Sequence, residues 1–280
     1  MQIIDGLGIA REIRERIKAE NLENNIKPRL AVVVVGDDKE SLVYVGLKEK
    51  AVEYTGGEVE HVIFPSNVTR DELVNRIKEL NEDSSIDGIL LQLPLPEDLN
   101  PFLEEILSAI SPHKDVDGFT PHNRGLLMGE KPSFTSCAAL AALEVIERNI
   151  ISLQGKKATL IGDSFDLILP LSVMLVRKGV NVDVIPELDK RELEASDIFV
   201  FEKGDPLSVT GEMINEGALV IDAGFHWLSY DKICGNVHNE NLKEKDGFLL
   251  PVPGGLGPIL ISKLLQNLQL AYRRNRLNNA

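Results

Sequence analysis

The feature that most constrains the fold is an uninterrupted run of aliphatic, mostly β-branched residues from Leu30 to Val35. A strand that is apolar on both faces is typical of a parallel sheet covered by helices, whereas a strand with one face in water alternates. Strand-like segments recur at 59–64 and 86–91, separated by a helical segment that ends at Gly56-Gly57 and another at 70–80. This alternation predicts a parallel α/β sheet with crossover helices.

A second region repeats the same rhythm. Strands are expected at 157–161, 180–185, 198–201 and 219–221, with a helix at 167–178, and this is half of a Rossmann pattern. A helix at 138–150 connects the two regions, and a turn-rich stretch at 250–258 precedes a final helix that runs to about Arg273. We therefore expect an α/β protein with two domains.

Composition and charge argue against nucleic acid and membrane as partners. The chain has 280 residues, 30 Lys and Arg, 44 Asp and Glu, and a formal net charge of −14, which argues against nucleic acid as a partner. The longest uncharged run, 247–262, contains three prolines and four glycines and cannot form a membrane helix. The amino terminus lacks the pattern of a secretory signal, so we expect a cytoplasmic protein that contacts no membrane.

Cysteine and histidine spacing gives no sign of a metal site. Cys137 and Cys234 are far apart and form no C-x-x-C pair, and the five histidines show no H-E-x-x-H or similar spacing. We expect no metal ion, no disulfide framework, and a reducing compartment.

A candidate active site lies on the helix that follows the Leu30–Val35 run. Ser41, Tyr44 and Lys48 are three and four residues apart, so they share one stripe of the helix. A second stripe is apolar and is expected to dock the helix on the core; it comprises Val43, Leu47, Ala51 and Tyr54. The alternative is that a Tyr and a Lys at this spacing belong to an ordinary solvated helix.

Two further polar residues stand where ligands are often bound. Gln92 ends the strand at 86–91, and the carboxyl edge of such strands is the usual binding edge of open α/β sheets. Asp117 lies in the acidic loop 114–119, directly before Gly118. The alternatives are that Gln92 satisfies backbone groups of its turn and that Asp117 serves only the turn.

Four motifs occur in order across nearly the whole chain: Y-x-x-x-K at 44–48, Q-L-P-L-P at 92–96, K-D-V-D-G-F at 114–119 and P-V-P-G-G-L-G-P at 251–258. Together they resemble the bifunctional methylenetetrahydrofolate dehydrogenase/cyclohydrolase family. The resemblance implies a folate-binding catalytic α/β domain at 1–136, completed by a carboxyl-terminal helix at 257–280. It also implies a Rossmann-like nucleotide-binding domain at 137–256, an active-site cleft between the two domains, and a homodimer.

The resemblance also assigns roles. Lys48 would be the general acid and base, Tyr44 would stack on the pterin-bearing substrate, and Gln92 would hydrogen-bond to Lys48. Asp117 would bind the pterin amino and ring nitrogens, since a carboxylate accepts two N–H bonds side by side. The remaining substrate-binding candidates are Ser41, Pro253, Gly254 and Gly255.

The nucleotide loop departs from the family pattern G-R-S-x-x-V-G-x-P. Asp163 replaces the arginine that would pair with the 2′-phosphate of NADP, and Ile168 replaces the second glycine. NADP is therefore disfavoured. NAD remains possible, because Glu187 lies near the spacing at which an acid binds a ribose hydroxyl. We expect Gly162, Ser164 and Glu187 to contact any cofactor.

Two other motifs are altered. The segment Glu202-Lys203-Gly204 stands where the family has a small residue before x-Gly, and Ser136-Cys137-Ala138-Ala139 replaces P-C-T-P. Both changes lie in segments that the resemblance associates with the cofactor side of the cleft.

These observations favour a tetrahydrofolate enzyme that retains methenyltetrahydrofolate cyclohydrolase activity and forms 10-formyltetrahydrofolate. The coupled NAD(P)-dependent methylenetetrahydrofolate dehydrogenase step is in question, and a cyclohydrolase alone needs no cofactor. An alternative is a folate-binding, non-catalytic paralogue with a regulatory or partner role. A third, an esterase built on Gly162-Asp163-Ser164, lacks the required Asp-x-x-His.

Overall fold

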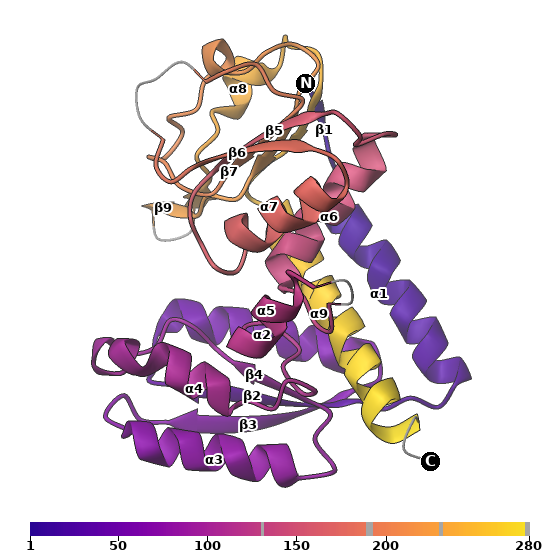
Figure 1. Cartoon of the computed structure of the whole chain (residues 1–280), viewed down its shortest axis with the longest axis vertical. Coiled ribbons are helices and arrows are strands. Elements are labelled where there is room, and N and C mark those ends of the chain that lie inside the picture. The colour runs from indigo at the N-terminus through magenta and orange to yellow at the C-terminus, as the bar shows by residue number, and fades with distance from the viewer. Residues whose placement is uncertain (130–131, 189–192, 230–231, 278–280) are drawn as a thin grey trace. The chain divides into compact units, whose positions relative to one another are not determined.

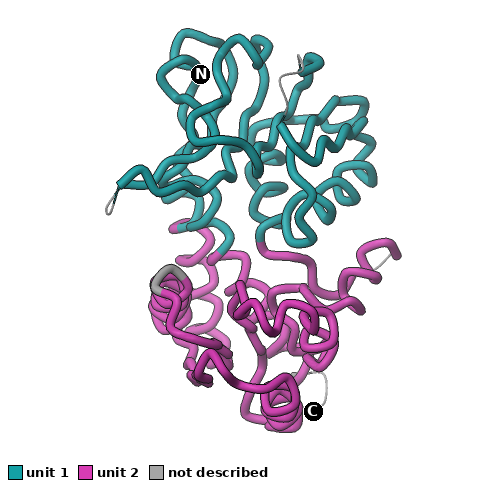
Figure 2. Tube along the Cα trace, turned by 90° about the vertical axis from the view of Figure 1, so that its left-hand side faces the viewer, with its two compact units in different colours: residues 1–10, 138–260 teal, residues 11–137, 261–280 magenta. Residues whose placement is uncertain are grey.

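The computed structural model describes residues 1–129, 132–188, 193–229 and 232–277. The chain forms two compact units: unit 1 comprises Met1–Ala10 and Ala138–Leu260, and unit 2 comprises Arg11–Cys137 and Ile261–Ala280 (Figure 2). The expected two-domain α/β fold is confirmed. The expected domains were 1–136 with 257–280, and 137–256; in the structure, residues 1–10 and 257–260 belong to unit 1 and Cys137 belongs to unit 2. Residues 1–10 belong there because the strand at 2–3 joins the sheet of unit 1.

Unit 2 is built on a three-stranded parallel sheet (Figure 1). Its strands are β2 (Arg29–Val35), β3 (Glu58–Phe64) and β4 (Gly88–Leu91), in the order β3-β2-β4. The crossover helices are α2 (Lys39–Tyr54) and α3 (Arg70–Glu82). The apolar run at 30–35 is the central strand and is buried throughout, as its lack of alternation predicts.

Helices and short turns complete unit 2. One face of the sheet packs on α3 and α4 (Leu103–Ala109), where Val33, Ile77 and Ile106 belong to one buried apolar cluster. A 3₁₀ turn, Glu97–Phe102, precedes α4, and α5 (Pro121–Leu126) follows the acidic loop. The helices α1 (Gly6–Glu23), α6 (Cys137–Asn149) and α9 (Leu256–Tyr272) each contain the boundary between the two units, and a π-helical turn, Arg273–Leu277, follows α9. Residues 278–280 of the expected carboxyl-terminal helix lie outside the described residues.

Unit 1 contains a six-stranded sheet in which every neighbouring pair is parallel, in the order β1-β11-β8-β7-β5-β6. The strands are β1 (Gln2–Ile3), β5 (Lys157–Ile161), β6 (Asn181–Ile185), β7 (Ile198–Phe201), β8 (Leu219–Asp222) and β11 (Phe248–Leu250). The helix α7 (Ile168–Arg177) connects β5 to β6. Because β6 and β7 lie on opposite sides of β5, the strand order reverses there, and this is the usual ligand-binding point of such sheets.

The rest of unit 1 consists of short elements. An antiparallel hairpin is formed by β9 (His226–Ser229) and β10 (Lys232–Cys234). A 3₁₀ turn, Gly211–Met213, and the short helix α8 (Asn239–Leu242) flank it in sequence.

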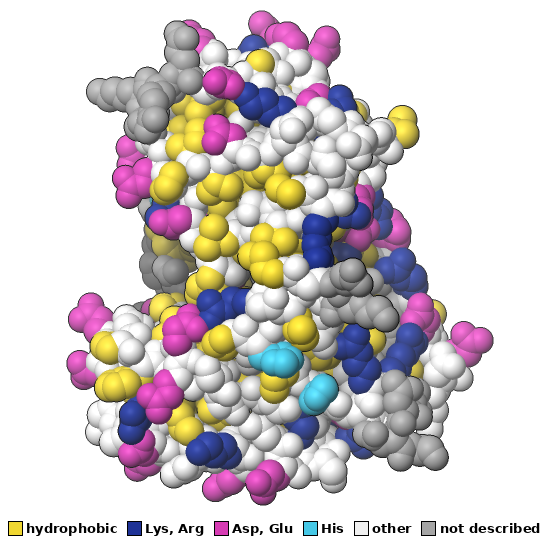
Figure 3. Space-filling model, viewed as in Figure 1, with side chains coloured by type: hydrophobic (Ala, Val, Ile, Leu, Met, Phe, Trp, Pro, Cys, Tyr) yellow, Lys and Arg dark blue, Asp and Glu magenta, His cyan; other side chains and the backbone are white. Residues whose placement is uncertain are grey.

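The side chains of the face shown in Figure 3 carry charges of both signs. On the face shown in Figure 3, basic and acidic side chains are interspersed rather than separated. Among the helices that the structure describes, none has the length and apolar character needed to cross a bilayer.

The packing of α2 differs from the expected one. Of the apolar stripe proposed to dock this helix, Val43, Leu47 and Tyr54 are 64%, 47% and 44% exposed, and only Ala51 is buried. The buried side is instead formed by Ser41, Val45, Lys48 and Val52. Apolar residues surround α2 on nearly all sides, so hydrophobic periodicity alone did not identify the buried face.

Candidate functional site

A buried lysine and a glutamine form the centre of the site in unit 2. Lys48 on α2 is 8% exposed, and its Nζ donates a hydrogen bond of 3.1 Å to Oε1 of Gln92. Gln92 directly follows β4, at the carboxyl edge of the sheet, and its Nε2 donates to the carbonyl of Leu93 at 2.6 Å. Because the amide nitrogen is held by a carbonyl, the amide oxygen faces the lysine.

The other candidates on α2 follow from the way the helix begins. The Asp38 carboxylate caps α2 by accepting a 2.8 Å hydrogen bond from the backbone N–H of Ser41. Ser41 is buried and Tyr44 is half-buried. The first turn of the helix is therefore fixed, and the Ser41, Tyr44 and Lys48 side chains follow at the expected spacing.

Asp117 joins this site through a cysteine. The thiol of Cys137 donates a hydrogen bond to the carbonyl of Val116 at 3.4 Å, and the charges of Asp117 and Lys48 both act on it. Burial, together with the Asp117 carboxylate, raises the pKa of the Cys137 thiol well above its ordinary value, while Lys48 opposes the rise. The structure thus places Lys48 in contact with Gln92, and the charges of Lys48 and Asp117 act on the same buried thiol; the catalytic roles of these residues stay predictions.

The loop that carries Asp117 is held in place by its neighbours. The Asp115 carboxylate accepts hydrogen bonds from the backbone N–H groups of Phe119 and Thr120, at 3.0 and 2.8 Å. Gly118 has a φ of +72°, and a Cβ at this position would lie 2.6 Å from the carbonyl carbon of Thr135. Gly118 therefore meets both a backbone and a steric requirement.

Two neighbours of the site were absent from the sequence-based candidates. Cys137 lies in the altered P-C-T-P segment, which pointed to the cleft without indicating a contact with Asp117. Asn267 on α9 donates to the carbonyls of Val116 and Thr135 at 2.8 and 3.1 Å, and it lies 3.6 Å from the Cys137 sulfur. Nothing in the sequence distinguishes Asn267 from other polar helix residues.

The glycine-rich loop at 253–255 belongs to unit 1. A Cβ on Gly6 would lie 2.5 Å from the carbonyl oxygens of both Gly254 and Gly255, so the loop packs directly on the first residue of α1. Gly254 has a φ of +86°. Because Gly6 has no side chain, the backbone of the loop can pack closely on it. The proposed role of Pro253, Gly254 and Gly255 in binding substrate stays a prediction.

The nucleotide loop between β5 and α7 is closed by Glu202, which directly follows β7. The Ser164 hydroxyl donates to Oε1 of Glu202, and its backbone N–H donates to Oε2 at 3.4 Å. In turn, the N–H groups of Leu167 and Ile168 each donate to Oγ of Ser164 at 3.1 Å. Gly162, with a φ of +138°, has no free space beside it: a Cβ there would lie 2.3 Å from Glu202 Oε2 and 2.9 Å from Ile168 Cγ1.

The surroundings of this loop are acidic. Asp163 pairs with Lys203 at 2.7 Å, and Glu187 and Glu202 add to the negative charge that raises the pKa of Lys203. Burial raises the pKa of Glu202, and the charges of Asp166 and Asp163 add to that rise, while Ser164 opposes it. These residues do not fit the pyrophosphate of a dinucleotide, because the Glu202 carboxylate already bonds to Ser164, whose hydroxyl oxygen accepts the N–H groups of Leu167 and Ile168 at the start of α7.

Within the described ranges, no group of three or more His, Cys, Asp and Glu side chains is placed to hold a metal ion.

Two family models match this chain. Residues 4–117 match the catalytic domain of tetrahydrofolate dehydrogenase/cyclohydrolase, and residues 136–276 match its NAD(P)-binding domain. The chain belongs to this family. It is therefore an enzyme of one-carbon folate interconversion with a folate-handling catalytic domain and an NAD(P)-binding domain, and the resemblance inferred from the four motifs is confirmed.

Individual members of the family match along their whole length. The bifunctional protein FolD 1 of Syntrophomonas wolfei is 50% identical over 279 residues, which cover 99% of this chain and 100% of that protein. The crystal structure of the bifunctional FolD of Campylobacter jejuni has a TM-score of 0.92 at 35% identity, covering 98% of this chain and 99% of that one. The FolD of Trypanosoma brucei, solved with NADP and an inhibitor, has a TM-score of 0.88 at 29% identity, covering 97% of each chain.

Proposed function

We propose that this protein catalyses the methenyltetrahydrofolate cyclohydrolase reaction, with Lys48 as its general acid and base. The observation that carries the proposal is the buried Lys48 Nζ held 3.1 Å from Gln92 Oε1, with the Asp117 carboxylate in the same cluster. In the reaction, water adds to the methenyl bridge carbon, the bond from that carbon to N5 breaks, and 10-formyltetrahydrofolate and one proton are released.

Each side chain has a distinct task in this proposal. Lys48, as the free amine, accepts a proton from the attacking water and returns one to N5 as the ring opens. Gln92 fixes the position of the amine by accepting one of its hydrogen bonds. Asp117 binds the pterin N–H groups, and Tyr44 packs against the ring system. Ser41, at the start of the same helix, contributes a further polar group to the substrate.

The test is the rate of methenyltetrahydrofolate hydrolysis, followed by its absorbance. Lys48→Ala should lower kcat by about 10²-fold or more, which is the usual loss on removing a general acid or base. Lys50→Ala is the matched control, because Lys50 is exposed on the same helix, and it should retain the full rate. A Lys48→Ala enzyme with unchanged kcat would remove the catalytic assignment. Folate binding without turnover by the unmodified protein would favour the non-catalytic alternative.

The dehydrogenase step depends on the nucleotide loop. The family match supports an NAD(P)-binding domain, and relatives bear bifunctional names, whereas Asp163 and Ile168 oppose NADP in this chain. We therefore propose that cyclohydrolase activity persists independently of a dinucleotide. Assay of methylenetetrahydrofolate oxidation with NAD and with NADP separates the two activities, and rapid turnover with NADP would show that Asp163 and Ile168 do not exclude this cofactor.

The remaining assignments concern the setting of the enzyme. We propose a tetrahydrofolate derivative as its small-molecule partner, a homodimer as its assembly, and the reducing cytoplasm as its location. Two buried free thiols, Cys137 and Cys234, suit a reducing compartment. Sedimentation of the purified chain tests the dimer.

A further inference from the structure

Side chains of this chain occupy the point at which the sheet of unit 1 reverses its strand order. The loop at 162–167 leaves β5, and Glu202 leaves the neighbouring β7, so both lie at the carboxyl edge where a dinucleotide normally binds. In such folds the pyrophosphate sits over the first turn of the helix that follows the first strand, where free N–H groups and the helix dipole attract an anion. Here that helix is α7.

In this structure, the anion at the loop before α7 is a carboxylate of the protein itself, that of Glu202. Glu202 accepts from both the hydroxyl and the backbone N–H of Ser164, and Ser164 Oγ accepts from the first N–H groups of α7. The backbone N–H groups of Ser164, Leu167 and Ile168 and the Ser164 hydroxyl, all donors of the kind that a phosphate would use, are therefore already engaged. Glu202 is half-buried and Ile168 is fully buried, and together they occupy the space beside Gly162.

Charge adds to this steric closure. Among the described residues, the carboxylates of Asp163, Asp166, Glu187 and Glu202 lie around this loop with the ammonium of Lys203. Asp163 holds that ammonium at 2.7 Å. A diphosphate brought here would be repelled by these carboxylates and would have to displace that of Glu202, which is already hydrogen-bonded to Ser164.

We propose that Glu202 is an internal substitute for the cofactor phosphate, and that it keeps NAD and NADP from binding tightly to this chain. The sequence comparison identified a large residue where the family has a small one, and the structure shows that this residue folds back onto the nucleotide loop. The proposal concerns unit 1 alone, so it can fail while the cyclohydrolase proposal stands, and the reverse also holds.

The experiment is a titration of the purified full chain with NAD and with NADP, followed by calorimetry and by the midpoint of thermal unfolding. The unmodified protein should show no saturable binding up to about 1 mM. Glu202→Ala, which removes the charge and opens the space beside Gly162, should bind at least one of the two dinucleotides about tenfold more tightly or better. Glu202→Gln removes the charge and keeps the volume, so its gain should be smaller.

Control variants distinguish the local effect of Glu202 on dinucleotide affinity from a general effect of removing negative charge. Glu212→Ala removes an exposed carboxylate from a 3₁₀ turn of the same unit and should leave dinucleotide affinity as it is in the unmodified chain. The double variant Glu202→Ala/Ile168→Ala should bind more tightly than Glu202→Ala alone. Micromolar binding of either dinucleotide by the unmodified protein overturns the proposal, and so does an absence of any gain in both Glu202 variants. Circular dichroism of each variant establishes that it is folded.

Discussion

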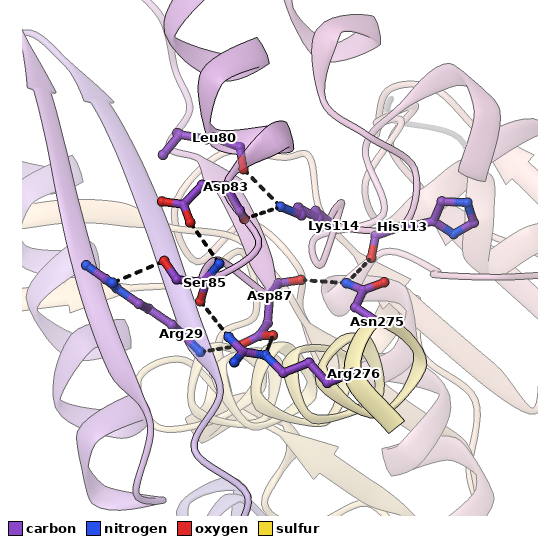
Figure 4. Close-up of polar contacts among 9 residues, drawn as sticks. All are labelled: Arg29, Leu80, Asp83, Ser85, Asp87, His113, Lys114, Asn275 and Arg276. Atoms are coloured by element: carbon purple, nitrogen blue, oxygen red, sulfur yellow. Dashed lines mark hydrogen bonds and ion pairs between the residues drawn. The ribbon is translucent and has the colours of Figure 1, made fainter. Parts of the chain in front are cut away.

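Replacing Arg276 by alanine should destabilise unit 2 by about 2 kcal/mol. Arg276, in the turn after α9, bonds to the carboxylate of Asp87 through Nε at 2.6 Å and through a terminal guanidinium nitrogen at 3.2 Å (Figure 4). Asp87 directly precedes β4 and is 1% exposed, and it also accepts the backbone N–H of Arg29 at 2.8 Å. The carboxyl-terminal segment is therefore tied to the sheet through one buried charge.

The expected loss of stability is estimated from the exposed fractions of the Arg276 and Asp87 side chains. Removing one partner of a fully buried ion pair costs about 3–5 kcal/mol, whereas an exposed pair contributes less than about 1 kcal/mol. The side chain of Arg276 is 38% exposed and that of Asp87 only 1%, so water would reach Asp87 partly once the guanidinium is gone. The backbone N–H of Arg29 would remain in place. An intermediate loss of about 2 kcal/mol is therefore expected.

Hydrogen exchange resolved by peptide is the suitable assay, because it reports on each unit separately. The amides of β2 and β4 should exchange faster in Arg276→Ala by the factor that corresponds to this loss, about 30-fold. The only tryptophan, Trp227, belongs to unit 1, so its fluorescence during unfolding serves as an internal control that should not change. Arg276→Lys keeps the charge without the two-pronged geometry and should lose less. If Arg276→Ala and the unmodified chain exchange at equal rates, Asp87 does not depend on this arginine.

Three other predictions follow from buried groups. Burial raises the pKa of Asp222 from 3.8 to about 6, so the folded state binds more protons than the unfolded state, and the free energy of unfolding should fall by up to about 3 kcal/mol as pH rises from 4 to 6. Cys137→Ala removes the buried thiol on which the Asp117 carboxylate acts and should raise KM for the folate substrate more than it lowers kcat. Gly6→Ala places a Cβ 2.5 Å from two loop carbonyl oxygens and should lower the unfolding midpoint, whereas Gly46→Ala, with open space, should raise it slightly.

Each of these predictions has a distinct contrary result. Denaturant titrations from pH 4 to 7 should give a flatter profile for Asp222→Asn than for the unmodified chain, and identical profiles would show that this carboxylate does not titrate there. An unchanged KM for Cys137→Ala would show that Asp117 is held without the thiol. Equal unfolding midpoints for Gly6→Ala and Gly46→Ala would show that the loop yields without cost.

The sequence revealed the long strands and left the short ones undetected. The run at 30–35 and the segments at 157–161 and 198–201 were predicted because each is apolar and long enough to show its pattern. In contrast, β1 has two residues and β11 has three, and no periodicity can be recognised over such lengths. The expected packing of α2 was wrong because its buried side includes a lysine, which hydrophobic patterning assigns to solvent.

The residues of the candidate site could be predicted where they belong to a recognisable sequence motif. The Y-x-x-x-K and Q-L-P-L-P motifs identified Lys48 and Gln92, and the structure places them in direct contact. The contact between Glu202 and Ser164 was not predictable, because it joins residues 38 positions apart and depends on β7 lying beside β5. A glutamate that follows a strand cannot be assigned a partner on another strand until the strand order is known.

The pairing of β1 with β11 has a consequence for the order in which the protein is made. The partners of residues 2 and 3, at 248 and 249, are synthesised about 245 residues after them. At roughly 5–20 residues per second, β1 waits some 12–50 s for its place in the sheet. During that interval its backbone is open to chaperones and proteases, and this edge of unit 1 stays incomplete until β11 has been made.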